Sequence, residues 1–578
     1  MIPGMNGRHS FTRTPLALLA ASAIVVRRAF LLRHSHCSRT FRYWAFGLIV
    51  SGSVAGCHSL TPDTNSTLAG IVVSADGKAL SDALVRLQGT AVTATTDTEG
   101  HFAIRAKELP PSKHLTAWKQ GFYNGGEAIN ADIAEYRIIL RPLPQRDNAQ
   151  YQWLPPRQVA NPEPGATACA DCHSEALFPV LNEWGKSAHA RSATNPLFLE
   201  FFSGSDERGP LLGGLGYKRD FPHSDGSCAT CHVPAMALHN PFGSDPRKAR
   251  GIEREGVFCD LCHKVEDVVS DPAGGHPGIL AMKLKRPGSG QQVFFGPLDD
   301  AFPGVSDLDS FNPIFKQSRY CAACHDGKFW NVSVYSEFRE WSESSYAERN
   351  IHCQACHMKP DGITRRVALE KEGSILRDPT TLASHALFGI NDEAFMREAV
   401  ALSANAEANG DRMKLRVTVK NVKAGHHIPT GSPMRNMVLV VDARDANDRR
   451  LAMLDGESIP AWAGTGPEAD GNYAGLPGKG YAKVLKRWPE YLADNRSLVL
   501  GPLYPSPFWR PVVLDYDNRI PAEGTDTSAY VFKLDAEAAK PLRVSVRLIY
   551  RKTFKSWLKP QAGDSNDTLL ANASLTLR

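Results

Sequence analysis

The chain has 578 residues, of which 42% are hydrophobic and 22% are charged. This balance is typical of globular proteins and excludes a disordered or coiled-coil chain, and the length predicts three or four domains. The formal net charge of +5 arises in residues 1–57, which hold seven arginines and neither lysine nor acid. The remaining 59 basic residues face 61 acidic ones, so the charge indicates no nucleic-acid partner.

Residues 1–57 are predicted to be a signal or lipoprotein leader, because arginines precede short apolar runs that end in small residues. The longest runs, residues 15–26 and 44–55, are too short to span a bilayer as a helix, which excludes a multi-span membrane protein. Val54-Ala55-Gly56-Cys57 resembles the lipobox of bacterial lipoproteins. The resemblance implies lipidation at Cys57 and, since His58 follows it, an outer-membrane lipoprotein on the periplasmic side or at the cell surface. An ordinary cleaved signal is the alternative.

Residues 66–143 alternate short β-rich runs with turn residues, which predicts an N-terminal β-sandwich. The frame Thr96-Asp97-x-x-Gly100-x-Phe102 resembles the carboxypeptidase regulatory-like (transthyretin-like) domain, a non-catalytic module. Two roles stay open for it: docking, through self-assembly or a polysaccharide or cell-surface contact, and plain stabilisation of the fold. Residues 144–164 are rich in proline and are expected to form a stiff linker.

Ten cysteines between residues 165 and 400 occur in five C-x-x-C-H frames, the attachment signature of c-type haem. Two such thiols bond the two vinyl groups of one porphyrin, and the adjacent imidazole binds its iron. A disulfide framework or a zinc ribbon gives no reason for a histidine after every second cysteine. The chain is therefore predicted to bind five haems covalently, in a pentahaem cytochrome c domain with short helices and little regular structure. The predicted attachment residues are Cys169, Cys172, Cys228, Cys231, Cys259, Cys262, Cys321, Cys324, Cys353 and Cys356, and the proximal ligands are His173, His232, His263, His325 and His357.

Eight further histidines are available for the sixth position of each iron. A filled sixth position favours electron transfer, whereas an open one can bind a small molecule. The predicted distal ligands are His189, His385 and His426, with His239 and His276 as weaker choices. His223 and His352 rank below these, and His427 lies beside His426 in the same segment.

The frame E-W-x-x-S-x-[HY]-A occurs after the first motif and again after the fourth, which suggests an old duplication. The [HY] position is His189 in the first copy of the frame and Tyr346 in the second. We expect His189 to lie on a helix, and Tyr346 to be a packing or hydrogen-bonding residue. His426 follows an alternating strand and lies between Gly425 and Pro429, so the turn could press its imidazole onto a haem. Residues 405–578 alternate strongly and predict a second, C-terminal β-sandwich-like domain that contributes this ligand.

From about residue 165 onward the chain resembles the multihaem c-type cytochromes of the cytochrome c-554-like group. Beyond the five motifs, the resemblance rests on Trp184-x-x-Ser187-x-His189, on residues 255–257 before the third motif and on residues 425–431. It implies bis-histidine haems stacked in close pairs, and it carries the distal role to His189, His385 and His426. The chain departs from this pattern at residues 305–308, where relatives often have a histidine, so one haem would take its partner from elsewhere or have none.

The predicted function is a pentahaem c-type cytochrome that carries electrons across the periplasm or outer cell envelope to redox protein partners. We expect an electron carrier without catalytic residues rather than an enzyme, because closely spaced haems with two strong ligands change oxidation state with little rearrangement. The alternative is a multihaem oxidoreductase that acts on a small nitrogen or sulfur compound at one open haem.

Overall fold

The computed structural model describes residues 66–160, 166–204, 215–269, 278–303, 308–488, 503–536, 538–558 and 567–578. The predicted leader with Cys57 and His58, and the predicted ligand His276, lie outside the described residues. Within those ranges, each helix is too short or too polar to cross a bilayer.

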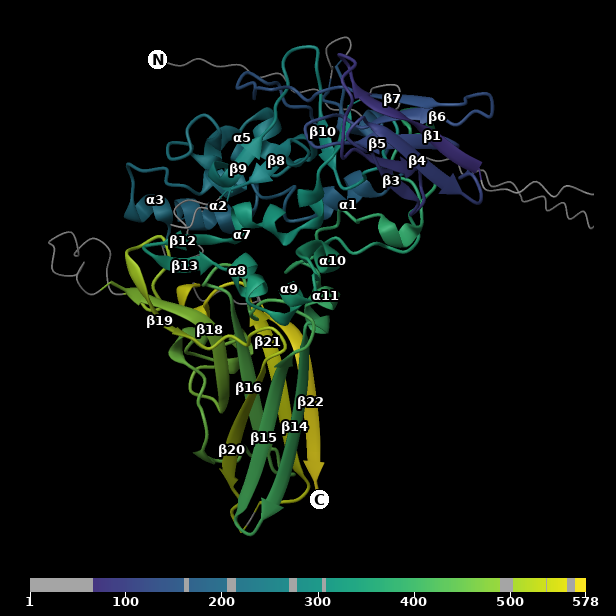
Figure 1. Cartoon of the computed structure of the whole chain (residues 1–578). Helices are drawn as coiled ribbons and strands as arrows, with labels where there is room; N and C mark the ends of the chain where they lie inside the picture. Colours follow the sequence, from purple (N-terminus) through teal and green to yellow (C-terminus); the bar gives the residue numbers. More distant parts are fainter. Residues whose placement is uncertain are drawn as a thin grey trace, which may run out of the picture. The chain divides into compact units, whose positions relative to one another are not determined.

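Residues 66–142 form two facing sheets, drawn in purple and blue in Figure 1. One has the order β4-β1-β7 and the other β3-β2-β5-β6. Val72, Val85, Ile104, Leu115 and Ile138 fill the space between them and are almost fully buried. One shared core between two sheets makes this part a β-sandwich. The strands are β1 (Ser66–Ser74), β2 (Leu84–Leu87), β3 (Thr93–Thr95), β4 (His101–Ala106), β5 (His114–Trp118), β6 (Gly125–Ala128) and β7 (Tyr136–Leu140).

The described part of the proline-rich stretch is packed against the third motif. Tyr151 Oη and the Leu154 N–H both donate to the carboxylate of Asp260, at 2.9 and 2.8 Å. Asp147 pairs with Arg286. This segment is therefore fixed to the haem-motif region along much of its length.

The motif region has little regular structure, and its longest described helix, α2, has eight residues. Four motifs lie on their own helical turns, α4 (Ala229–His232), α6 (Cys259–Cys262), α7 (Ala322–His325) and α10 (Cys353–His357), and the first begins with a 3₁₀ turn, η1 (Cys169–Asp171). The other helices are α1 (Val180–Lys186), α2 (Pro196–Ser203), α3 (Tyr217–Asp220), α5 (Pro234–Ala237), α8 (Glu337–Ser342), α9 (Ser345–Glu348) and α11 (Glu393–Glu398). Three two-stranded sheets complete it: β8 (Val265–Val268) with β9 (Met282–Leu284), β10 (Phe294–Gly296) with β11 (Asp309–Phe311), and β12 (Gly327–Phe329) with β13 (Val332–Tyr335).

His189 lies in a turn after α1, so the prediction of a helical position is wrong. The helix ends at Lys186 because Ser187 adopts an extended conformation, with its N–H bonded to the Trp184 carbonyl. The Ser187 hydroxyl then accepts the Ala190 N–H at 3.3 Å. Serine competes for backbone groups in this way and is poorly suited to a helix interior.

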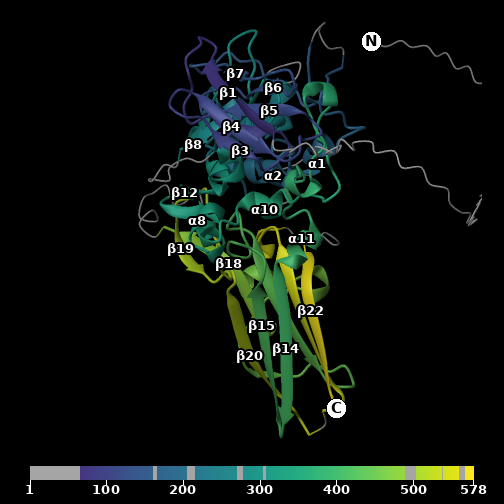
Figure 2. The same ribbon diagram turned by 45° about the vertical axis from the view of Figure 1, so that its right-hand side comes forward.

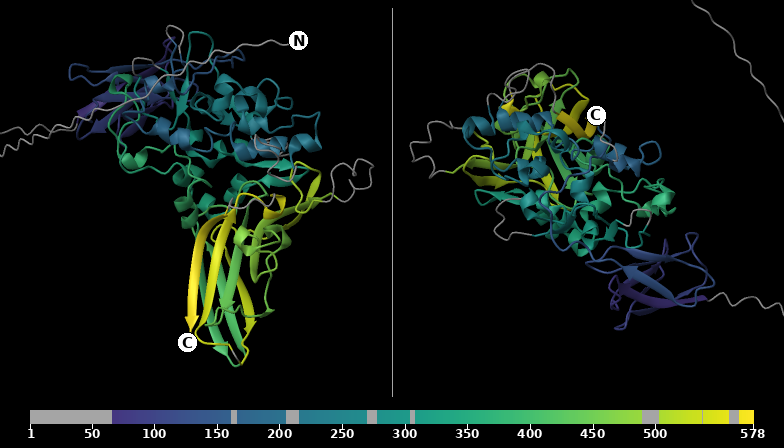
Figure 3. Two further views of the ribbon diagram at one scale, coloured as in Figure 1. Left: turned by 180° about the vertical axis from the view of Figure 1, so that it is seen from behind. Right: turned by 90° about the horizontal axis from the view of Figure 1, so that it is seen from above.

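The described residues between 400 and 577 form a second β-sandwich, whose long strands run side by side in Figures 2 and 3. Its sheets have the orders β14-β15-β20-β17 and β19-β18-β16-β21-β22. Strand β15 alternates buried and exposed residues, and its Met413, Leu415, Val417 and Val419 pack into the core between the sheets. The strands are β14 (Val400–Asn409), β15 (Arg412–Asn421), β16 (Asn436–Arg444), β17 (Met453–Asp455), β18 (Gly478–Arg487), β19 (Val512–Asp517), β20 (Thr525–Lys533), β21 (Leu542–Arg551) and β22 (Asp567–Leu577).

Candidate haem sites

All five motifs line one cavity of about 3370 Å³. The ten cysteines and five histidines of the motifs are among its lining residues, together with His189, His352, His385 and His426. An ordinary small-molecule pocket measures roughly 300–1,000 Å³, so this space suits several large groups. Aromatic side chains, including Trp184, Phe315 and Tyr320, form part of its walls and suit the faces of porphyrins.

Four of the five motif histidines are oriented by a backbone carbonyl. Because a carbonyl only accepts, the imidazole Nδ1 carries the proton, and Nε2 keeps a lone pair for a metal. The pairs are His173 with Val367 at 2.7 Å, His232 with Ser192 at 3.3 Å, His263 with Phe295 at 2.6 Å and His357 with Phe388 at 2.6 Å. These tautomers fit iron ligation through Nε2.

In the fourth motif, the Nδ1 of His325 faces a carboxylate instead of a backbone carbonyl. Its Nδ1 lies 3.6 Å from Oε1 of Glu337. Burial opposes ionisation of Glu337, but its close contact and charge interaction with His325 lower its pKa to about 2. Burial also lowers the pKa of His325, and Glu337 outweighs this and raises it. Among the motif histidines, all of which the structure describes, only His325 therefore has a charged group at its Nδ1.

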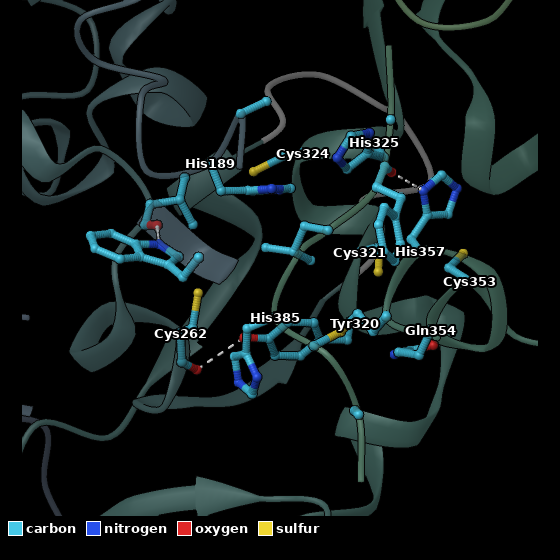
Figure 4. A pocket seen from close by; sticks show the side chains of 18 of the residues that line it. His189, Cys262, Tyr320, Cys321, Cys324, His325, Cys353, Gln354, His357 and His385 are labelled. Carbon is cyan, nitrogen blue, oxygen red and sulfur yellow. Dashed lines mark hydrogen bonds between the residues drawn. The ribbon is translucent and has the colours of Figure 1, made fainter. Parts of the chain in front are cut away.

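Two motif histidines face a second imidazole at the separation expected for two ligands of one iron. A metal–imidazole nitrogen bond is about 2.0 Å long, which places opposed ring centroids roughly 6.3 Å apart. The centroids of His189 and His325 are 6.2 Å apart, and those of His357 and His426 are 6.3 Å apart. Figure 4 shows His189 beside Cys324 and His325. These two distances favour bis-histidine ligation at the fourth and fifth motifs.

His385 belongs to the region of the first and third motifs. Burial lowers its pKa to about 4, and the imidazoles of His263 and His173 lower it further in that order. Its backbone N–H donates to Glu183 Oε2 at 2.7 Å, and Figure 4 draws it in the same cavity as Cys262. Among the described residues, the buried Nδ1 atoms of His385 and His189 have no hydrogen-bond partner.

The remaining candidate histidines are placed differently. The side chains of His239 and His223 are exposed, and neither lines the cavity. His352 uses its Nδ1 to accept from the N–H and the hydroxyl of Ser318, both at 3.2 Å. The Nδ1 of His427 lies 3.7 Å from Glu340. The structure therefore brings none of these four opposite a motif histidine.

His232, in the second motif, meets no second imidazole among the ring contacts of the described residues. Its ring stacks on Phe198 with centroids 3.7 Å apart and planes 2° apart. Burial lowers the pKa of His232 to about 4, and the positive charge of Arg435 contributes in the same direction. Arg435 thus places a positive charge near this site.

Electrostatic interactions between cysteine side chains show which motifs adjoin. Cys169 of the first motif interacts with Cys259 of the third, and Cys231 of the second interacts with Cys324 of the fourth. Cys321 of the fourth motif also interacts with Cys353 of the fifth. The Tyr320 hydroxyl, next to the fourth motif, donates to the carbonyl of Cys262 at 3.0 Å. The fourth motif therefore adjoins the second, third and fifth.

Sequence reasoning missed the groups that orient the proximal imidazoles. Glu337 belongs to no recognisable frame, and a carbonyl such as that of Val367 or Phe388 has no side-chain signature. Tyr346, the counterpart of His189, packs under Arg349, whose guanidinium carbon lies 4.7 Å from the ring centroid. The Tyr346 ring also lies against Gly425.

Residues 168–264 match the family described as cytochrome c554 and c-prime. A solved structure, a penta-heme cytochrome c552 from Thermochromatium tepidum, is similar at 19% identity with a TM-score of 0.49, and covers 71% of this chain and 97% of that chain. No curated protein sequence matches the chain. The family match, the motifs and their oriented histidines support a multihaem c-type cytochrome with covalently bound haem, a class of proteins that transfer electrons.

Proposed function

We propose that the chain binds five c-type haems and passes electrons among them, with bis-histidine ligation at the fourth and fifth motifs. The main support for this proposal is the distance between imidazole ring centroids, which is 6.2 Å for His189 and His325 and 6.3 Å for His357 and His426. Each bound haem supplies a one-electron couple at its iron. At the fourth and fifth motifs the protein's part is to hold two imidazoles for each iron, so that the coordination of that iron changes little between oxidation states.

Contacts between motifs support an order for the relay. The first and third motifs adjoin through Cys169 and Cys259, and Tyr320 links the third motif to the fourth. The fourth also adjoins the second and the fifth. In this proposal the fourth site is a junction through which electrons from the first and third sites reach either of the two remaining sites.

The test uses the full chain expressed with a c-type maturation system. The mass should exceed that of the polypeptide by five haems, and a potentiometric titration should be reversible. Electron paramagnetic resonance should show low-spin iron at the sites of His325 and His357. A mature protein with fewer than five haems, or with high-spin iron at both sites, would contradict the proposal.

We also propose export and a lipid anchor at Cys57, with redox proteins of the cell envelope as donor and acceptor. The support is the lipobox-like sequence at residues 54–57 and the requirement of c-type haem attachment for an exported chain. Metabolic labelling with a fatty acid should mark the wild type and not a Cys57→Ser variant, which should leave the membrane fraction. Equal labelling of both proteins would contradict an anchor at this residue.

A second candidate function is binding or reduction of a small nitrogen or sulfur compound at the second motif. It is favoured by the lack of a second imidazole opposite His232 within the described residues, and by the nearby charge of Arg435. An iron with an open position should bind carbon monoxide when reduced and cyanide when oxidised. If neither ligand alters the spectrum of the five-haem protein, this candidate fails.

A further inference from the structure

We infer that the N-terminal β-sandwich orients the proximal histidine of the third motif, His263, by holding strand β10 in place. The inference rests on the proposed haem binding and deepens it, because it gives this domain a role at one site. The chain of contacts runs from Tyr123 and Asn124 of the sandwich through Gln292 and strands β10 and β11 to the imidazole of His263.

The last link is a reciprocal pair of hydrogen bonds. The Nδ1 of His263 donates to the carbonyl of Phe295 at 2.6 Å, and the N–H of Phe295 donates to the carbonyl of His263 at 2.9 Å. Phe295 is the middle residue of β10 and is 2% exposed. The position of this short strand therefore determines the direction of the His263 ring.

Strand β10 has little support from its own sheet. It pairs with β11 over three residues in a parallel arrangement, and a pair this short is not stable alone in water. Strand β11 is in turn held by the sandwich, because the hydroxyl of Ser310 donates to the Phe122 carbonyl at 2.9 Å and the Asn124 N–H donates to the Asp309 carbonyl at 2.9 Å.

Side chains of the sandwich bond to strand β11 and to the segments that flank strand β10. The Tyr123 hydroxyl donates to the Gln292 carbonyl, two residues before β10, at 2.6 Å. The Asn124 amide accepts the N–H of Phe311 at 3.0 Å and donates to the carbonyl of Ala301 at 3.3 Å. Tyr123 and Asn124 are 6% and 7% exposed, so these bonds are largely shielded from competing water.

The same contact has an apolar part. Tyr123 and Leu143 form one buried cluster with Val293 and Phe295. Beside it, the rings of His114 and Phe302 stack with centroids 3.8 Å apart. A domain attached only as a spacer would meet its neighbour through exposed polar groups, whereas this contact resembles the interior of a domain.

The orientation of His263 has a measurable consequence. A strong hydrogen bond from Nδ1 makes the imidazole a better electron donor to its metal, which stabilises the oxidised iron. Loosening β10 lengthens this bond, so the midpoint potential of the third haem should rise. The other four proximal imidazoles take partners outside β10, namely Val367, Ser192, Glu337 and Phe388, so their potentials should stay unchanged.

The experiment compares the full five-haem protein with two variants, Tyr123→Phe and Asn124→Ala. Tyr123→Phe removes one hydroxyl and keeps the ring in its cluster. The matched control is Tyr136→Phe. It also removes one hydroxyl, which donates to the carbonyl of Asn130 within the sandwich itself. Haem content is measured by mass, and midpoints by potentiometric titration, with the third haem assigned from a His263→Met variant.

We expect both variants to raise the midpoint of the third haem and to alter its low-spin resonance, with the larger shift in Asn124→Ala, and the control to match the wild type. An unchanged third midpoint in fully loaded Tyr123→Phe, or an equal shift of all five midpoints, would overturn the inference. If the Asn124→Ala variant does not take up its haems, the midpoint potential of the third haem in Tyr123→Phe alone tests the inference. A wild type that lacks five haems would instead overturn the proposed function.

Discussion

Trp184 and Trp341 donate equivalent hydrogen bonds at two separate places in the chain. The indole N–H of Trp184 bonds to the Val257 carbonyl at 2.9 Å, and that of Trp341 bonds to the Ile351 carbonyl at 2.8 Å. Each acceptor lies two residues before the first cysteine of a motif, Cys259 or Cys353. The repeated E-W-x-x-S frame thus corresponds to a repeated contact that holds the start of a haem-attachment turn.

The glutamates of this frame also have equivalent partners. Glu183 accepts the backbone N–H of His385 at 2.7 Å, and Glu340 accepts that of His427 at 3.1 Å. Each frame therefore connects an attachment turn to a histidine-bearing segment from later in the chain. The two copies of the frame thus make equivalent contacts, as the predicted duplication would require.

Replacing Trp184 by phenylalanine should destabilise the protein by about 1–3 kcal/mol, because it leaves the carbonyl of Val257 without its donor in a largely buried setting. Urea unfolding of the five-haem protein measures this loss. Because the bond lies two residues from Cys259, the low-spin resonance of the third haem should also change.

Trp462→Phe is the matched control for this prediction. Trp462 is 2% exposed and donates to the Tyr516 hydroxyl at 2.9 Å within the C-terminal sandwich. It should lose similar stability with unchanged haem spectra. Identical spectral changes in both variants would show that Trp184 has no specific role at the third site.

Replacing His189 or His426 by alanine should leave one iron with a single imidazole ligand. The reason is the pair of centroid distances near 6.3 Å, which place these rings opposite His325 and His357. Each variant should gain one high-spin, carbon monoxide-binding iron in five, and the double variant two. His223→Ala, at an exposed side chain, should match the wild type. An unchanged low-spin spectrum in His189→Ala would remove that residue from the ligand set.

The haem attachment could be read from the sequence because it requires particular residues at fixed spacing. The distal ligands were only partly predictable, since His189 precedes its partner His325 and His426 follows its partner His357, and no spacing rule connects them. The sequence makes His239 a weaker candidate than His385 but still includes it among the ligands, and in the structure its side chain is exposed. The N-terminal sandwich is predicted from short β-rich runs between turn residues, and the C-terminal one from alternation. Contacts such as Tyr123 with Gln292 were not, because the acceptor is a backbone carbonyl far along the chain.

Replacing Glu337 by glutamine should raise the midpoint potential of the haem held by His325. The carboxylate lies 3.6 Å from Nδ1 and is buried, so its negative charge favours the more positive, oxidised iron. Potentiometric titration should show one shifted midpoint. Glu393→Gln, which removes an exposed carboxylate paired with Arg397, should shift none. A fall of the midpoint in Glu337→Gln would contradict this electrostatic account.

Lys483 should make stability depend on pH in the alkaline range. Its ammonium donates to the Ser333 carbonyl at 2.9 Å and the Ser336 hydroxyl at 2.7 Å, where the C-terminal sandwich meets the motif region. Burial and the charge of Arg519 lower its pKa to about 8, against 10.5 in the unfolded chain, and Glu340 and Asp517 oppose this. Between these values the unfolded state binds more protons than the folded state.

Stability should therefore rise as pH increases from 8 to 10, by at most about 1.4 kcal/mol per pH unit from this group. Well below pH 8 the contribution should be constant, because the lysine is then protonated in both states. The measurement is urea unfolding of the wild type and of Lys483→Met at several pH values, taken as a difference so that other titrating groups cancel. A difference that does not change between pH 8 and 10 would mean that Lys483 keeps its ordinary pKa in the folded protein, and a difference of the opposite sign would mean that Glu340 and Asp517 outweigh its burial.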